Sequence, residues 1–287
     1  MNLELTFLGT GTSAGVPMIA CRCDVCRSTD PRDRRSRPSV LVRYPQLTGD
    51  GDEPVQRALL VDAGPDLREQ AMRHDLDRVD SVLFTHAHAD HVLGVDDLRR
   101  FNAVMKQPLN IYAERVVLEA LGQMFSYIFN ARANLNNSFV ANLICHGIHA
   151  GEAVDLFGAR WTPLRLLHGR LPILGFRVDW RGRSLAYCTD VSSFPAETYP
   201  LLEGLDLLVI DALRHRHHPT HLTVDQALEQ IEQIRPGQAY FTHIAHDVSH
   251  AELETQLPET VAAAYDGLTV SLAATEPEQT PAAEKRN

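Results

Sequence analysis

The chain has 287 residues, of which 44% are hydrophobic, and a formal net charge of −10 at pH 7. This length and apolar content are sufficient for a substantial core, in one large α/β domain or two small ones. The acidic charge argues against broad electrostatic capture of nucleic acid. No apolar run approaches the length of a membrane span and nothing near the N-terminus resembles a signal peptide, so we expect no membrane association.

The first half of the chain alternates short apolar strands with helical stretches. Apolar, β-rich runs predict strands at residues 3–8, 39–43, 58–61, 80–84 and 109–112. Helices are predicted at residues 65–73, with Pro65 at the start, and at residues 114–124. Residues 93–98 are expected to begin another helix, and residues 49–54 form a polar loop.

The sequence of the second half of the chain predicts a second layer of strands and helices. Strands are expected at residues 161–167, 173–180, 184–189, 207–210 and 238–242. Arg181-Gly182-Arg183 would turn a hairpin, and Thr223 would cap a helix over residues 223–234. Each half would supply a mixed sheet and outer helices, which gives an α/β fold of the αββα sandwich type. The segment 275–287, rich in Pro, Glu, Ala and Lys, is predicted to be a disordered tail.

The most informative segment is Thr85-His86-Ala87-His88-Ala89-Asp90-His91, which places three imidazoles and one carboxylate within six positions. It lies on a predicted strand-to-helix turn, where side chains can converge. His86 and His88 alternate on an extended backbone, whereas Asp90 and His91 point differently, so one turn can serve two ions. These ligand types suit zinc, manganese or iron. Polar residues on a surface loop are the alternative, which the spacing disfavours.

This motif resembles the metal motif of the metallo-β-lactamase-fold hydrolases, a family whose further ligands follow strands downstream. Three residues of this chain stand directly after predicted strands: His168, Asp190 and His243. Taken singly, each would more often be a solvated or core residue. The resemblance implies one divalent ion on His86, His88 and His168, a second on Asp90, His91 and His243, and Asp190 as the bridge. It also implies a hydrolase domain of that fold over residues 1–274.

A cysteine cluster lies in the segment Cys21-Arg22-Cys23-Asp24-Val25-Cys26. Three closely spaced thiols cannot all form disulfides, and this spacing more naturally holds one tetrahedral zinc. The predicted structural zinc ligands are Cys21, Cys23, Cys26 and His246. The arrangement resembles the PhnP-like cyclic phosphodiesterases, in which such a zinc accompanies the dinuclear site. Redox-active or buried free thiols are the alternatives. Cys145 and Cys188 lie in apolar runs and are predicted to be core residues.

Two further residues are assigned roles by the same resemblance. Asp62 ends a buried strand and is expected to orient a histidine ligand, although it could simply cap the strand. His221 has a counterpart in the PhnP-like enzymes and is the candidate for phosphate contact or for protonation of the leaving group. His215, His217 and His218 in the same loop are interpreted as solvated residues, any of which could line the site.

The resemblance implies a phosphodiesterase that uses a hydroxide bridging two ions, zinc or manganese, to hydrolyse a small cyclic phosphate ester. Ribosyl 1,2-cyclic phosphate and 2′,3′-cyclic nucleotides are examples. A nuclease resembling tRNase Z is the first alternative, but the basic run Arg32–Arg37 is short for an RNA platform. A non-hydrolytic role like that of PqqB is the second. Thioesterases of the glyoxalase II type share the metal motif, so the motif alone does not identify the type of bond that is hydrolysed.

The expected partner is a small phosphodiester substrate, without membrane and with nucleic acid disfavoured. Unpaired thiols and the lack of an export signal predict a cytoplasmic location. The apolar stretch Phe125-Ser126-Tyr127-Ile128-Phe129 could form a homodimer surface or a pocket lid, but the end of a core helix is the preferred interpretation.

Overall fold

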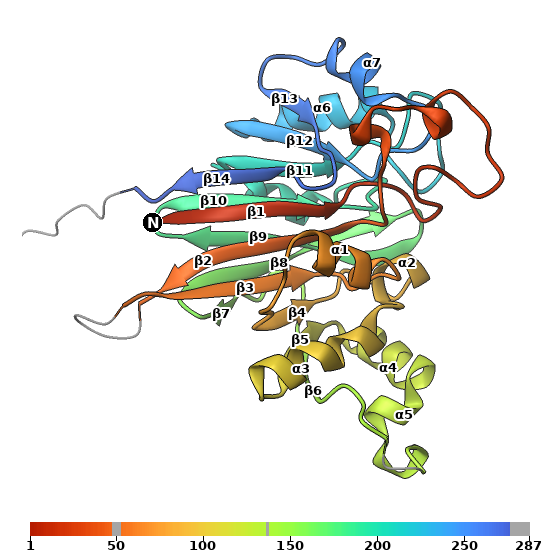
Figure 1. Cartoon of the computed structure of the whole chain (residues 1–287). Helices are drawn as coiled ribbons and strands as arrows, with labels where there is room; N and C mark the ends of the chain where they lie inside the picture. The colour runs from red at the N-terminus through yellow and green to blue at the C-terminus, as the bar shows by residue number, and fades with distance from the viewer. Residues whose placement is uncertain (48–52, 136–137, 276–287) are drawn as a thin grey trace, which may run out of the picture.

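The computed structural model describes residues 1–47, 53–135 and 138–275. Two seven-stranded sheets form the centre of the molecule, and helices lie on both outer sides (Figure 1). This confirms the predicted αββα sandwich. The segment 276–287 lies outside the described residues, as does most of the loop at 49–54, and a single domain over residues 1–274 stays a prediction.

The first sheet has the strand order β14-β1-β2-β3-β4-β5-β6. Its strands are β1 (Asn2–Gly9), β2 (Ser39–Gln46), β3 (Val55–Val61), β4 (Ser81–Leu83), β5 (Leu109–Ala113), β6 (Leu143–Gly147) and β14 (Thr269–Ala273). Strands β3 to β6 run parallel, and the remaining neighbours are antiparallel. The carboxyl ends of β3, β4 and β5 therefore meet at one edge of the sheet.

The second sheet has the strand order β13-β12-β11-β10-β9-β8-β7. Its strands are β7 (Val154–Leu156), β8 (Ala159–His168), β9 (Leu171–Trp180), β10 (Arg183–Cys188), β11 (Leu207–Asp211), β12 (Gln238–Thr242) and β13 (Val261–Ala263). Strands β10 to β13 run parallel, and β8 runs in the same direction because it pairs antiparallel with β9. The hairpin of β9 and β10 confirms the turn predicted around Gly182.

The helices are short. They are α1 (Leu67–Arg73), α2 (Ala89–Val92), α3 (Arg99–Met105), α4 (Arg115–Met124), α5 (Ser126–Phe129), α6 (Val224–Ile234) and α7 (His250–Glu254). Short 3-10 helices occur at η1 (Val25–Arg27), η2 (Pro31–Asp33), η3 (Val95–Leu98), η4 (Ala131–Ala133) and η5 (Ala196–Leu202). Thr223 caps α6 through a capping box with Gln226, as its position before the helix predicted. No helix among the described residues is long and apolar enough to span a membrane.

Three hydrophobic clusters join the four layers. One lies between the sheets, where Phe7 and Val40 pack with Trp161 and Phe176. A second packs the outer face of the first sheet against α3 and α4, through residues such as Phe101 and Leu121 of those helices. The third packs the second sheet against α6 and α7. Accordingly, α6 and α7 lie above the strands in Figure 1, and α3, α4 and α5 lie below them.

Two predictions, one about a helix at residue 93 and one about the burial of Cys145, were wrong. No continuous helix begins at residue 93, since the chain makes α2, then η3, then α3. Cys145 is exposed on β6 instead of buried, because β6 is an edge strand with little covering it. Cys188 is buried as predicted. Phe125 belongs to the core beneath α4, which supports the core interpretation of residues 125–129.

Asp80 fixes the start of β4, the strand that leads to the metal motif. Its side chain is 1% exposed and accepts hydrogen bonds from Arg57 (2.8 Å), Arg78 (2.6 and 2.8 Å) and the Ala58 amide (2.9 Å). Burial opposes ionisation, but these donors hold the pKa of Asp80 below its ordinary value of 3.8. The stabilisation is therefore present above that value and is lost as the pH falls through the lower folded-state pKa.

We expect Asp80→Ala to lower the free energy of unfolding by about 2–3 kcal/mol, because two arginines lose a buried partner while Arg78 can still reach water. Urea unfolding at neutral pH measures the change. Glu119→Gln is the control, since Glu119 pairs with Arg115 at an exposed position where about 0.5 kcal/mol or less is at stake. Equal stability of the Asp80 and Glu119 variants would contradict the assignment.

Candidate metal centre

The H-x-H-x-D-H motif occupies the turn between β4 and α2, as predicted. His88 has an extended backbone and stands directly before α2, whereas Asp90 and His91 lie within its single turn. The rings of His86 and His88 are 4.5 Å apart and those of His86 and His91 are 4.2 Å apart. The change from extended to helical backbone turns the two halves of the motif in different directions around one point.

The downstream residues lie close to the motif because the carboxyl ends of β8, β10 and β12 in the second sheet lie beside the carboxyl end of β4 in the first. His168 ends β8, Asp190 follows β10 and His243 follows β12. The ligand atoms of His86, His88 and His168 all lie within 4.8 Å of one another, as do those of His86, His91 and Asp190. A backbone hydrogen bond from Leu174 of β9 to Thr85 (3.0 Å) ties the second sheet to the motif.

Asp190 lies between the remaining candidates. Its Oδ2 is 3.3 Å from His91 Nε2 and 3.4 Å from His243 Nδ1. Asp90 Oδ2 is also 3.3 Å from His91 Nε2. The seven predicted ligands thus lie close to one another, with Asp190 near both His91 and His243. The predicted set of His86, His88 and His168 forms one compact group, whereas the predicted second set of Asp90, His91 and His243 does not, and the bridging role of Asp190 stays a prediction.

The centre has the chemistry of a cation site. Three imidazole nitrogens of the centre are buried without a hydrogen-bond partner among the described residues: His86 Nε2, His91 Nε2 and His243 Nδ1. Burial lowers the pKa of His86 well below its ordinary value and also lowers the pKa of His168 and His243, which favours the neutral imidazole that binds metals. Several buried nitrogens without hydrogen-bond partners lower the stability of the folded state unless a cation binds them. The residues therefore fit bound divalent ions.

Protein groups behind the histidines determine which nitrogen faces inward. Asp62 Oδ2 accepts from His91 Nδ1 (2.7 Å) and from the Thr85 hydroxyl (2.8 Å), and its Oδ1 accepts from the Thr85 amide (2.9 Å). His91 is consequently left with Nε2 toward the centre. The Thr220 carbonyl does the same for His168 by accepting from its Nδ1 (2.9 Å). Asp62 thus has the geometry that its predicted orienting role requires.

His221 faces the same centre. The centroid of its ring lies 4.7 Å from those of both His168 and His243, and its ligand nitrogen lies within 4.8 Å of the ligand nitrogen of His168 and the carboxylate oxygen of Asp190. Its Nδ1 is 2.6 Å from Oδ2 of Asp211, a carboxylate with no solvent exposure at the end of β11. Burial raises the pKa of Asp211 well above its ordinary value and lowers the pKa of His221.

Asp211 is the residue that reasoning from sequence missed. Like Asp62, it is an aspartate at the end of a buried strand, which was the available signal. The neighbouring loop histidines differ from one another: His215 and His217 are exposed, whereas His218 is half-buried with its ring 5.0 Å from that of His221. Of the three loop histidines, His218 is thus the one beside the centre, and its interpretation as a solvated residue that could line the site stays a prediction.

Three residues of the centre have a left-handed backbone. The φ angles are 64° at Asp62, 56° at Asp190 and 59° at His243. Such a conformation is uncommon for residues other than glycine. It occurs where each strand ends abruptly and the side chain turns toward the centre, so local backbone preference is overridden at these three positions.

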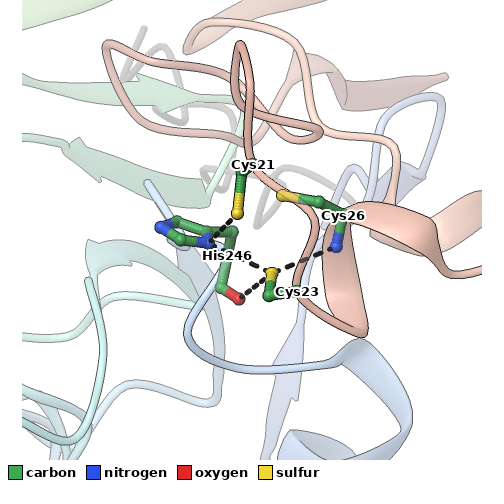
Figure 2. Close-up of side chains that lie close together, drawn as sticks. All are labelled: Cys21, Cys23, Cys26 and His246. Carbon is green, nitrogen blue, oxygen red and sulfur yellow. Dashed lines mark hydrogen bonds between the residues drawn. The ribbon is translucent and has the colours of Figure 1, made fainter.

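The cysteine cluster forms a second candidate metal site. Figure 2 shows the side chains of Cys21, Cys23, Cys26 and His246 directed toward one another. His246 Nδ1 is 3.4 Å from Cys21 Sγ and 3.3 Å from Cys23 Sγ, and the four ligand atoms all lie within 4.8 Å of one another. All five cysteines of the chain are free of disulfides. One nitrogen and three sulfurs suit a tetrahedral zinc ion.

We expect Cys23→Ser to remove zinc from this cluster and to lower the melting temperature, because metal binding of this kind is coupled to folding. Some turnover should survive in the folded fraction, since the cluster is separate from the histidine centre. His246→Ala should behave alike, and Cys145→Ser is the control because Cys145 is exposed on an edge strand. Elemental analysis and calorimetry measure both effects. Unchanged zinc content and melting temperature in Cys23→Ser would exclude the site.

Known proteins agree with this architecture. Residues 57–244 match the family described as a beta-lactamase superfamily domain. The crystal structure titled a new diphosphatase from the PhnP family is 41% identical, with a TM-score of 0.83 over 95% of this chain and 98% of that one. Zn²⁺-bound PqqB from Methylobacterium extorquens has the same fold, with 21% identity and a TM-score of 0.71 over 94% of this chain and 100% of that one.

A curated relative gives a less direct likeness. The octanoyltransferase of Porphyromonas gingivalis is 37% identical over 268 residues, which are 93% of this chain but 51% of that protein. The chain thus spans about half the length of this relative. The family match covers well over half of the chain, and the diphosphatase is similar along nearly its whole length. The chain therefore belongs to the beta-lactamase superfamily and, within it, to the PhnP family.

Proposed function

We propose that the protein is a metal-dependent phosphodiesterase that hydrolyses a small, cyclic phosphate ester with two divalent ions, zinc or manganese. The observation that carries the proposal is the Asp211–His221 pair, which lies against the candidate ligands His168, Asp190 and His243. Divalent cations held there would lower the pKa of water and neutralise phosphoryl oxygens. Breaking an ester bond also requires a proton for the departing alkoxide, and His221 is the residue placed to supply it.

The chain's own residues would divide the work as follows. Asp62 and the Thr220 carbonyl hold the ligands His91 and His168 in the required orientation. Asp211 holds His221 through Nδ1, which leaves Nε2 of His221 to exchange a proton with substrate. Asp190 is the proposed bridge between the ions. A site with these parts supports both attack on phosphorus and release of an alkoxide.

The basic run near the cysteine cluster supports a small substrate over RNA. Arg35 is buried and donates to Asp33 and to the carbonyls of Ala245 and Val248. Arg32 pairs with Asp30, and Arg37 pairs with Asp66. Three of the four arginines are thus engaged within the protein, which disfavours a nuclease with an RNA-gripping platform here. Free thiols in all five cysteines support a cytoplasmic location as part of the same proposal.

Two other bond types have specific support. The likeness to a diphosphatase favours a phosphoric anhydride as the second candidate substrate, since the same centre would serve both P–O bonds. The likeness to an octanoyltransferase favours an acyl thioester as the third, although that protein has as much sequence again outside the match. A thioester needs little help from an acid because a thiolate leaves readily.

One panel of substrates decides among these. The metal-loaded protein is assayed with 2′,3′-cyclic nucleotides, ribosyl 1,2-cyclic phosphate, bis-p-nitrophenyl phosphate, ADP-ribose as a diphosphate ester, precursor tRNA, and octanoyl and glutathione thioesters. We expect the cyclic esters to give the highest kcat/KM. Cleavage of a thioester without any phosphorus substrate would overturn the proposal, and preferred cleavage of ADP-ribose would reassign it to the anhydride.

A further inference from the structure

We propose that His218 is a substrate-binding residue, whose Nε2–H donates a hydrogen bond to a phosphoryl oxygen on the outer side of His221. The assignment deepens the proposed function and rests on it for the identity of the ligand. It concerns the one histidine of the exposed loop 215–218 that turns inward, since His215 and His217 are exposed and His218 is half-buried.

The ring of His218 has a defined place beside the centre. It lies 5.0 Å from the ring of His221, at an angle of 48°. The ring of His221 is in turn 4.7 Å from the ring of His168. His221 thus contacts both a proposed metal ligand and His218. Among the described residues His218 belongs to none of the groups that could hold a metal ion, but its ring borders His221, where the proposed substrate would bind.

Hydrogen bonds fix which nitrogen of His218 is the donor. The Thr220 amide (3.4 Å) and hydroxyl (3.1 Å) both face His218 Nδ1. An amide can only donate, so Nδ1 accepts and the proton of the neutral ring is on Nε2. The other two rings are held in the same way, since His168 Nδ1 donates to the Thr220 carbonyl and His221 Nδ1 bonds to Asp211. Each of these three rings thus has Nδ1 bound to protein and Nε2 free.

The backbone keeps this loop in place. Gly169 has a φ of 62°, and a Cβ there would lie 2.9 Å from Cγ2 of Thr220, so the turn after β8 packs closely on Thr220. The Leu222 amide donates to the Val191 carbonyl (2.9 Å), and the Leu213 amide donates to the Leu222 carbonyl (3.0 Å). Thr220, which orients His218, is consequently held on both sides. A preorganised donor of this kind binds an anion at little cost in entropy.

Four variants test the assignment. His218→Ala and His218→Phe remove the donor, and the phenylalanine keeps a ring against His221. His218→Gln restores a donor at the position of Nε2. His217→Ala is the matched control, one residue away and exposed. The measurements are calorimetric binding of inorganic phosphate to the metal-loaded protein, kinetics on bis-p-nitrophenyl phosphate, metal content and melting temperature.

We expect the alanine and phenylalanine variants to weaken phosphate binding and raise KM by about 10–100-fold, the range for a hydrogen bond to a charged group. The kcat and the metal content should stay near the wild-type values, the glutamine variant should recover much of the binding, and His217→Ala should match the wild type. Unchanged phosphate affinity in His218→Phe would overturn the assignment. Loss of metal would overturn it too, because it would give His218 only a structural role through Thr220.

The measurement of phosphate binding distinguishes a failure of the His218 assignment from a failure of the proposed function. If the wild type binds phosphate but hydrolyses no phosphodiester, the proposed function fails while the variants still decide the role of His218. If the wild type binds no phosphate when loaded with metal, the assignment of His218 is wrong.

Discussion

Asp190→Ala is expected to abolish turnover and to release at least one of two ions from the histidine centre. Asp190 is 2% exposed and lies close to both His91 and His243. Burial opposes its ionisation, but His243 and His91 hold the pKa of Asp190 well below its ordinary value, so it is an anion at neutral pH. Removal of this charge leaves two facing groups of imidazoles without the carboxylate that neutralises their cations.

The expected loss of rate is at least about 10²-fold, because the pKa of zinc-bound water is near 7 in a closed protein site and near 9 on aqueous zinc, and loss of the proposed bridging carboxylate would open the site to solvent. Metal analysis and kcat on the best cyclic substrate measure the two effects. Asp190→Asn is the matched variant, since it keeps the shape and removes the charge, and we expect it to lose nearly as much. An active wild-type preparation with only one ion besides the cysteine-bound zinc would contradict the dinuclear site.

His221→Ala is expected to reduce turnover of alkoxide-releasing cyclic esters by about 10²–10⁴-fold, the usual contribution of a general acid. The metal content should be unchanged, because the proposal places the proton donor outside the ligand set. The ligand nitrogen of His221 nevertheless lies within 4.8 Å of the ligand nitrogen of His168 and the carboxylate oxygen of Asp190. Loss of metal from His221→Ala would therefore reassign this histidine as a ligand.

The leaving group distinguishes an acid from a phosphate contact. A p-nitrophenolate needs little protonation, so His221→Ala should lose less on bis-p-nitrophenyl phosphate than on cyclic esters if His221 is the acid. An equal loss on both substrates would indicate phosphate binding. Asp211→Asn should show the same dependence on leaving group in weaker form, because Asp211 acts only through the orientation of His221. Unchanged rates in both variants would make His221 an ordinary buried histidine.

The sequence predicted the central strands from their apolar pattern, whereas the choice of the downstream ligands came from the family resemblance. Each candidate follows an apolar run directly, as His243 follows β12 and Asp190 follows β10, and parallel strands bring their carboxyl ends to one edge. The end of a strand can be located in the sequence, and it also places the residue at the carboxyl edge of the folded sheet. The capping box of Thr223 was equally readable because it is local.

The parts that could not be predicted depend on contacts between distant segments. The short edge strands β6 and β13 have no distinctive pattern and exist because a neighbouring strand offers its hydrogen-bonding groups. Cys145 was placed in the core since an apolar run does not reveal that its strand lies at an edge. The partner of His221 is ten residues earlier in the chain, across a loop, so no spacing rule identified Asp211.

The left-handed backbone at Asp62, Asp190 and His243 has a consequence for protein engineering. Each such residue costs of order 1–3 kcal/mol, least for aspartate. Selection of variants for thermal resistance alone would favour glycine or asparagine at these positions. The selected proteins would have higher thermal stability but would lack metal ligands or the residue that orients them. A stabilising library for this scaffold should therefore keep the three positions fixed and should be screened for retained metal as well as for heat tolerance.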